Sequence, residues 1–261
     1  MAGFGSAIGI LTSALILTAP LGAQAPAPTP ASPRSARQAA PIDLTGNWVS
    51  VVTEDWRWRM VTPLKGDAAS VPINAEARKI VDAWDPVKDE AAGLQCKAYG
   101  APAVMRVPGR LRISWQDEAT LKIETDAGTQ TRLMHFDAHP PKDGEPSWQG
   151  SSAAKWESGQ SNPGGLGFGL SPRVGARSRS LEVVTTQLRS GYLRKNGVPY
   201  SDRTTVTEYF DRFTEPNGEE WFTVMTIVND PVYLYIPFVT TTDFKKEPDG
   251  SRWAPSPCSA R

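Results

Sequence analysis

Short segments that alternate apolar and polar residues, separated by turn signals, constrain this chain more than any other feature. The expected strands are 44–53, 54–62, 103–107, 110–116, 120–126, 129–137, 148–157, 181–188, 204–213, 220–229 and 233–244. Strands spaced about every eight to twelve residues are typical of an antiparallel barrel or sandwich. The clearest helical spacing is in residues 75–84, "AEARKIVDAW", with Asn74 as N-cap and Asp85-Pro86 as the end, and a weaker helical turn is expected at 87–92. We therefore expect a mainly β protein with one short helix near 75–84.

The N-terminus predicts export. Residues 8–19, "IGILTSALILTA", form an apolar run that is shorter than the roughly 20 residues a membrane-spanning helix needs. The small-residue pattern Ala23-Gln24-Ala25 follows, as in a secretory signal, although no Lys or Arg precedes the run. We expect residues 1–25 to be a signal peptide and the protein to be periplasmic or secreted, without a stable membrane span in the mature chain. The alternative is an uncleaved N-terminal anchor.

The next boundary follows from composition. Residues 26–41, "PAPTPASPRSARQAAP", have no periodic apolar positions and cannot bury enough surface to offset chain entropy. We expect them to be a disordered linker. Residues 42–261 then form a single β-barrel domain, since nothing in them repeats at a fixed period.

Charge and cysteine content narrow the partners. The chain has 28 Lys plus Arg and 28 Asp plus Glu, with no basic block, so we expect no nucleic-acid partner. Its two cysteines, Cys96 and Cys258, fit one disulfide in an exported protein, the alternative being two free buried thiols. Neither cysteine has a nearby histidine, so they predict no metal site.

One motif carries a family resemblance. The segment "DLTGNW" at 43–48 resembles the Gly-x-Trp opening of lipocalin-type barrels through Gly46 and Trp48. The resemblance implies that Trp48 plugs one end of a barrel and contacts a basic residue near the last strand, here Lys245 or Lys246. The family usually has Arg there, is shorter, and lacks the segment "GYLRKNGVPYS". The chain as a whole also resembles uncharacterised secreted bacterial proteins, which implies no activity.

The segment "VTEDWRWRM" at 52–60 is the first candidate site. On a strand, Asp55, Arg57 and Arg59 would share one face, with neighbours about 6.6 Å apart. The two arginines could hold one carboxylate or sulfate, with Asp55 orienting Arg57. We lean towards these charges lining a barrel cavity. The alternative puts Trp56 and Trp58 in the core and the charges in water.

The segment "GYLRKNGVPYS" at 191–201 is the second candidate. Asn196-Gly197 predicts a tight hairpin, which brings Tyr192 and Tyr200, with Arg194 and Lys195, near its base. Tyr and Arg often carry recognition energy, so Tyr192, Arg194 and Tyr200 are candidate ligand-binding residues. The alternative is an exposed basic hairpin.

Two further residues are candidates for acid–base chemistry. His135, in "HFDAH", has an unperturbed pKa near neutrality, and Glu208 could be an interior carboxylate or the partner of an arginine. A metal held by His135 and His139 is disfavoured, because residues i and i+4 of a strand lie about 13 Å apart.

These features predict an exported, monomeric barrel that binds a small amphipathic or aromatic molecule with an acidic group. Arg57, Arg59 and Arg194 would hold the acid, and Trp and Tyr side chains the apolar part. One alternative is a cofactor-independent lyase, isomerase or hydrolase in the same barrel, with His135 or Glu208 as base. Another is a periplasmic protein-interaction module that uses the Gly-rich 158–180 loop. No cofactor and no metal is predicted.

Overall fold

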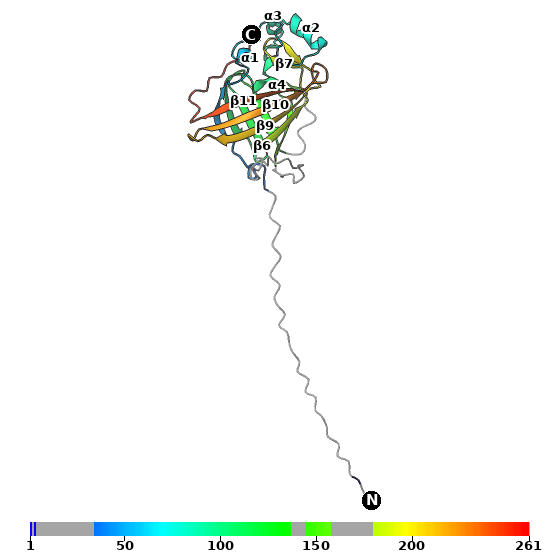
Figure 1. The fold of residues 1–261 in the computed structure, drawn as a ribbon. Coiled ribbons are helices and arrows are strands. Elements are labelled where there is room, and N and C mark those ends of the chain that lie inside the picture. Colours follow the sequence, from blue (N-terminus) through cyan, green and yellow to red (C-terminus); the bar gives the residue numbers. More distant parts are fainter. Residues whose placement is uncertain (2, 4–33, 137–144, 158–179, 261) are drawn as a thin grey trace, which may run out of the picture. The chain divides into compact units, whose positions relative to one another are not determined.

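In the computed structural model, which describes residues 1, 3, 34–136, 145–157 and 180–260, nine strands close into a barrel (Figure 1). They are β1 (Gly46–Val51), β2 (Arg110–Trp115), β3 (Thr120–Thr125), β4 (Thr131–His135), β5 (Ser151–Trp156), β6 (Ser180–Thr186), β9 (Thr205–Thr214), β10 (Glu220–Asn229) and β11 (Phe238–Glu247). Their order around the barrel is β1-β11-β10-β9-β6-β5-β4-β3-β2. The expectation of a mainly β barrel is confirmed.

One pair of neighbouring strands runs parallel. An odd number of strands cannot alternate direction all the way around a closed barrel, and here β4 and β5 pair in parallel, with Met134 opposite Ser152. The other neighbouring pairs are antiparallel. This arrangement differs from the eight-stranded up-and-down barrels of lipocalins.

The interior is filled because every second residue of each strand points inward. On β9, for example, Val206, Glu208 and Phe210 are all buried. The interior includes an aromatic group in which Phe222 contacts both Phe244, stacked at 4.8 Å, and Trp48, edge-on at 4.7 Å.

The contact expected between Trp48 and a basic residue is present. Trp48 is fully buried, and its Nε1 donates to the carbonyl of Leu44 at 2.9 Å. Lys246 lies opposite Trp48 in the β1–β11 register, with its Nζ 5.6 Å from the indole centroid. Lys245 points to the other face, where it lies over Trp221.

Short helices and a hairpin gather at one end of the barrel (Figure 1). They are α1 (Trp56–Arg59), α2 (Ala75–Ala83), α3 (Pro86–Ala91), the 3-10 helix η1 (Gln95–Tyr99), α4 (Ala101–Val104) and the hairpin of β7 (Gly191–Arg194) and β8 (Val198–Tyr200). Val81, Leu193, Val198, Tyr200 and Val228 belong to a second apolar cluster that joins this layer to the barrel. Among the described residues, no helix combines the length and apolar character needed to cross a membrane.

Several local predictions are confirmed. The helix near 75–84 is α2, and the side chain of Asn74 caps it by accepting from the backbone N–H of Ala77. The hairpin turn at Asn196-Gly197 is present, with Gly197 at φ +82°. Cys96 and Cys258 form a disulfide, with their Cα atoms 5.1 Å apart.

Three strand predictions are wrong. Residues 54–62 contain the helical turn α1, which follows Asp55 in the left-handed region at φ 53°. Residues 103–107 overlap the helix α4, so they form no hairpin with the strand that follows. That strand, β2, pairs with β1 and β3. The last strand begins only at Phe238, because residues 231–233 form a turn held by Asp230.

The start of the compact unit also differs from the expected boundary, since the unit begins at Arg34 instead of Ile42. The carbonyl of Ala36 accepts from Trp156 Nε1 at 2.8 Å, and Ser35 Oγ donates to Glu118 at 2.6 Å. The expected signal peptide, apart from residues 1 and 3, lies outside the described residues, as do the 158–179 part of the Gly-rich loop, Asp137 and His139.

Candidate functional site

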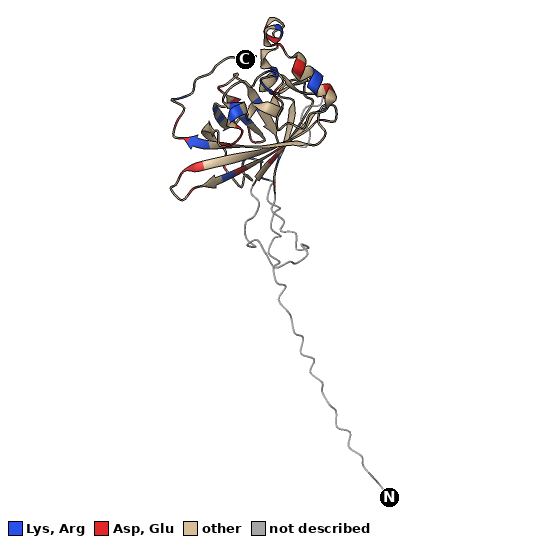
Figure 2. Ribbon diagram, turned by 45° about the horizontal axis from the view of Figure 1, so that its top comes forward, with Lys and Arg blue, Asp and Glu red and all other residues tan. Residues whose placement is uncertain are grey.

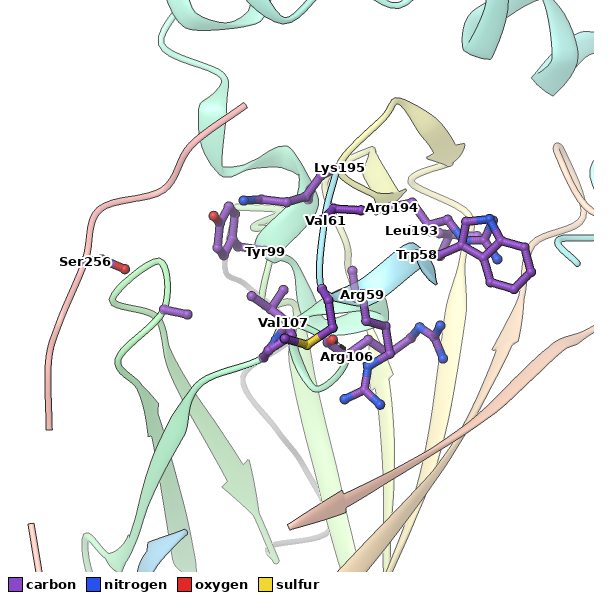
Figure 3. Close-up of a pocket in the computed structure, with 15 residues that line it drawn as sticks. Trp58, Arg59, Val61, Tyr99, Arg106, Val107, Leu193, Arg194, Lys195 and Ser256 are labelled. Carbon is purple, nitrogen blue, oxygen red and sulfur yellow. Dashed lines mark hydrogen bonds between the residues drawn. The ribbon is translucent and has the colours of Figure 1, made fainter. Parts of the chain in front are cut away.

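A pocket of about 310 Å³ opens at the helix-covered end of the barrel (Figure 3). It lies between α1, the segment after α4, and the β7–β8 hairpin. Its apolar wall includes Trp58, Met60, Val61, Tyr99, Val107 and Leu193, and its cationic wall consists of Arg59, Arg106, Arg194 and Lys195. Elsewhere, basic and acidic residues are interspersed along helices and strand ends (Figure 2). Four cations on one pocket therefore stand out in a chain with zero formal charge.

Arg59 is part of the framework of this pocket. Its side chain is buried, and its Nη1 lies 2.9 Å from Glu54. Its Nε donates to the carbonyl of Arg106 at 3.0 Å, and its Nη2 donates to Ser50 Oγ at 3.2 Å. Burial lowers the pKa of Arg59, and the charge of Glu54 opposes that effect. All three guanidinium nitrogens are thus engaged, and they hold α1 against the barrel rim.

Arg106 is only partly paired. Its Nη2 lies 2.7 Å from the carboxylate of Asp55, which neutralises its charge. Its Nη1 is buried and has no hydrogen-bond partner. The guanidinium lies 5.8 Å from the ring of Phe238, at the start of β11.

Arg194 carries the largest unmet hydrogen-bonding capacity in the pocket. It is 5 % exposed, and its Nη1 donates to the carbonyl of Ala69 at 2.7 Å. Its Nε and Nη2 are buried without partners. The ring of Trp58 lies beside the guanidinium, 4.7 Å from its carbon, and covers one face of it (Figure 3).

The electrostatic environment of Arg194 also indicates that its charge is incompletely compensated. Burial, and then the nearby positive charge of Arg106, lower the pKa of Arg194 to about 10. Removing a cation from water is costly unless an anion compensates it. Asp55 and Asp67 act in the opposite direction without cancelling the shift. The site therefore favours an added negative charge.

The structure brings some of the sequence-predicted residues together at this pocket. Arg59 and Arg194 both line it, although they come from segments that are far apart in the chain. Asp55 orients Arg106 and not Arg57. Arg57 pairs with Asp67 at 3.1 Å and is largely exposed, so it lies beside the pocket wall.

The arrangement expected for "VTEDWRWRM" is wrong in one respect. The segment is not a barrel strand, so its charges do not line the barrel interior. The alternative with both tryptophans in the core is also wrong, since Trp56 is 67 % exposed and Trp58 Nε1 donates to Asp67 at 3.2 Å.

The two hairpin tyrosines lie away from the pocket wall. Tyr192 donates to the carboxylate of Asp89 at 2.9 Å and contacts Lys97. Tyr200 is fully buried, and its ring packs where Gly100 and Gly191 leave room. The positions of both tyrosines suit packing of the hairpin against η1 and α4.

His135 and Glu208 lie on opposite faces of the barrel wall. Glu208 points inward and forms two hydrogen bonds with Arg132. His135 is half-buried on the outside and lines a separate pocket with Glu145 and Gln149. The two candidate bases therefore do not share one site. Within the described residues, no three His, Cys, Asp or Glu side chains are grouped as a metal site would need.

Arg106 is the charged pocket residue that sequence reasoning missed, whereas Lys195 was expected near the base of the hairpin. Arg106 sits in "AVMRV", whose strand-like pattern places an arginine on a solvent face. Lys195 adjoins Arg194 in the hairpin turn, with its Nζ 5.3 Å from the ring of Tyr99. No local signal connects these residues to Arg59, because the folding of the barrel end brings them together.

Comparisons of this chain with known protein families, with curated proteins and with solved structures found no significant match.

Proposed function

We propose that this protein is an exported barrel that binds a small amphipathic or aromatic molecule with an acidic group, in the pocket at the helix-covered end. The observation that carries the proposal is the buried, unpartnered edge of Arg194 beside an apolar wall. A buried donor without a partner costs roughly 1–3 kcal/mol, and more when it is charged. An acidic ligand would remove that cost by supplying acceptors and charge.

The rest of the pocket supports the same class of ligand. Small-molecule sites are concave, of roughly 300–1,000 Å³, and combine mostly apolar walls with a few placed polar groups. This pocket has a volume of about 310 Å³. Trp58, Tyr99 and Leu193 offer flat or apolar surface next to the arginines. A single aromatic ring system with one acid group matches this size and division.

The ligand position differs from that of a lipocalin-type barrel with a deep cavity. The interior here is packed with side chains such as Trp48, Phe210 and Phe222. The ligand would instead sit at the mouth, under α1 and the β7–β8 hairpin. Export is part of the proposal, and the disulfide between Cys96 and Cys258 supports it, since such bonds persist in oxidising compartments.

The test compares 1-naphthoate with the neutral 1-naphthol by isothermal titration calorimetry. We expect 1-naphthoate to bind at least tenfold more tightly, and the Arg194→Gln variant to remove most of that preference. The matched control is Arg189→Gln, because Arg189 also stacks on a tryptophan, Trp148, at 4.7 Å, but on the surface and outside the pocket. Equal binding of both compounds to the unmodified protein would overturn the proposal.

A further inference from the structure

The C-terminal segment, residues 254–260, forms part of the rim of the pocket at the helix-covered end. Ser256 lines this pocket together with Ala127, from the turn between β3 and β4, and Tyr99, from η1 (Figure 3). The segment runs along the surface, since residues 254–257 are all exposed. It also belongs to no strand of the barrel, so it can leave the rim while the barrel ladders stay intact.

The non-covalent contacts that hold Ser256 and Ser259 are hydrogen bonds near the surface. The backbone N–H of Ser256 donates to the carbonyl of Asp126 at 2.9 Å, and its carbonyl accepts from Thr129 Oγ1 at 2.9 Å. The N–H of Ser259 donates to the hydroxyl of Tyr99 at 3.3 Å. Of residues 254–260, Ala260 alone is buried. Such hydrogen bonds add little net stability, because water replaces them when they break.

The covalent hold on the segment is the disulfide between Cys258 and Cys96. Cys96 belongs to η1, the same 3-10 helix that supplies Tyr99 to the pocket. The bond therefore ties the segment to the opposite part of the rim, two residues beyond Ser256. A tether of this kind gives the segment a high effective concentration beside its hydrogen-bond partners, so the weak contacts form while the disulfide is intact.

The surroundings of the disulfide suit thiol exchange. Cys96 and Cys258 are both partly exposed, so the bond is not sealed in the core. The side-chain amide of Gln130 donates to Cys258 Sγ at 3.4 Å. A hydrogen bond to a sulfur favours its thiolate, and exchange is faster when the departing thiolate is stabilised. Cys258 is therefore the better leaving group when a thiolate attacks Cys96.

We propose that residues 254–260 are a strap that closes one side of the ligand pocket, and that reduction of the Cys96–Cys258 bond releases the strap and weakens ligand binding. This regulation rests on the proposed function above. The reductant is a protein dithiol. One of its thiolates attacks Cys96 Sγ, which forms a mixed disulfide and expels Cys258 as a thiolate that takes up a proton. The second thiol then displaces Cys96, so two electrons and two protons pass to the cysteines and the dithiol becomes a disulfide.

Hydrogen–deuterium exchange of the full chain tests the release of the strap without a ligand. Dithiothreitol is the reductant, and the chain has only the two cysteines of this bond. We expect the amides of Ser256 and Ser259, read on C-terminal peptides, to exchange at least tenfold faster after reduction. The near-ultraviolet circular dichroism should stay unchanged, because the barrel core is intact. Equal exchange in both forms would overturn the inference, and so would loss of the dichroism signal, which shows general unfolding.

Calorimetry with 1-naphthoate tests the effect of the strap on the pocket. We expect reduction to weaken binding at least fivefold. The Cys96→Ser/Cys258→Ser variant should bind as weakly as the reduced protein, with or without dithiothreitol, which separates loss of the bond from effects of the reductant. The oxidised Thr129→Val variant lacks one hydrogen bond to the strap but keeps the disulfide, so it should bind within a factor of two of the unmodified protein.

The results distinguish the strap from the proposed function. If the oxidised and reduced proteins bind 1-naphthoate equally, the strap inference fails and the proposed function stands. If the oxidised protein binds 1-naphthoate no more tightly than 1-naphthol, the proposed function fails, and the regulation of that site fails with it.

Discussion

Arg132 and Glu208 face each other across the inside of the barrel through two parallel hydrogen bonds. Nη1 lies 3.1 Å from Oε1, and Nη2 lies 2.5 Å from Oε2. Both side chains are 0 % exposed. They come from β4 and β9, which are not neighbours in the barrel, so the pair links strands that share no backbone ladder. Thr185 adds a hydroxyl acceptor for Arg132 at 3.4 Å.

Breaking this ion pair by one substitution should be strongly destabilising. Arg132→Met leaves the Glu208 carboxylate buried without its partner, and we expect the free energy of unfolding to fall by about 3–5 kcal/mol. The double variant Arg132→Met/Glu208→Leu should recover a large part of that loss, since no charge is left in the core. Urea denaturation measures all three proteins.

The control for this prediction is a pair of the same charges on the outside of the barrel. Lys155 and Glu182 lie 2.9 Å apart on β5 and β6, and the lysine side chain is 68 % exposed. Lys155→Met should change the free energy of unfolding by no more than about 1 kcal/mol. Similar losses in the free energy of unfolding for Lys155→Met and Arg132→Met would contradict the prediction that burial makes the Arg132–Glu208 pair costly to break.

The two hairpin tyrosines should respond in opposite directions to removal of the hydroxyl. Tyr200 has no hydrogen-bond partner for its buried hydroxyl, so Tyr200→Phe should raise the free energy of unfolding by about 1 kcal/mol or more. Tyr192 donates to Asp89 at 2.9 Å, so Tyr192→Phe should lower it by about 1–2 kcal/mol. Thermal and urea unfolding measure the free energy of unfolding of both variants. A less stable Tyr200→Phe would contradict the absence of a hydrogen-bond partner for the Tyr200 hydroxyl.

High pH provides an independent check on Tyr200. Burial raises its pKa in the folded protein well above the usual value of 10.0. Above pH 10 the unfolded chain loses that proton while the folded chain keeps it. Stability therefore falls as pH rises, by at most about 1.4 kcal/mol per pH unit for each such tyrosine. In Tyr200→Phe, the free energy of unfolding should fall less steeply between pH 10 and 11.5, because the contribution of one tyrosine is removed.

Loss of the disulfide should cost more than most single substitutions. Cys96 and Cys258 are 162 residues apart, and closing so long a loop stabilises by about 5 kcal/mol in the chain-entropy model. The Cys96→Ser/Cys258→Ser variant should therefore unfold at a much lower urea concentration than the oxidised protein. The chemically reduced wild-type protein is the control and should match the variant. An unchanged midpoint would show that the bridge does not limit the unfolded chain.

Gly46 should not tolerate any side chain. Its φ of +126° is a conformation that side chains rarely adopt, and an added Cβ would lie 3.3 Å from Lys246 Cε. Gly46→Asn should lower the free energy of unfolding by more than about 1 kcal/mol. Gly93, at φ +68° with nothing near its Cβ position, is the matched control, because asparagine accepts the left-handed region. We expect Gly93→Asn to be nearly neutral, and calorimetric melting compares the two.

Local patterns were sufficient wherever neighbouring residues decide the conformation. The alternation in 204–213 and 220–229 predicted β9 and β10 because a period of two buries one face of a strand. Asn74 predicted the start of α2, since its side chain can reach a backbone N–H only three residues away. The contact between Trp48 and Lys246 was predicted from the resemblance to the Gly-x-Trp motif and not from the properties of the neighbouring residues.

Local patterns failed where a segment was too short for a helical repeat to be told from a strand repeat. Four residues, Trp56–Arg59, are too few to separate a strand repeat of two from a helical repeat of 3.6. The left-handed conformation of Asp55 starts the helical turn, and no residue in "VTEDWRWRM" predicts that conformation. Arg59 turns inward because Glu54 and Ser50 accept its hydrogen bonds.

The sequence by itself determined that this chain forms a mainly β barrel with a short capped helix, because those features depend on the order of neighbouring residues. Only the tertiary structure decided the candidate site. Arg59, Arg106 and Arg194 come from α1, the segment after α4, and β7, and they meet at one end of the closed barrel. Buried cations find partners through space and not along the chain, so no local pattern could reveal that the Nε and Nη2 of Arg194 are left without hydrogen-bond partners.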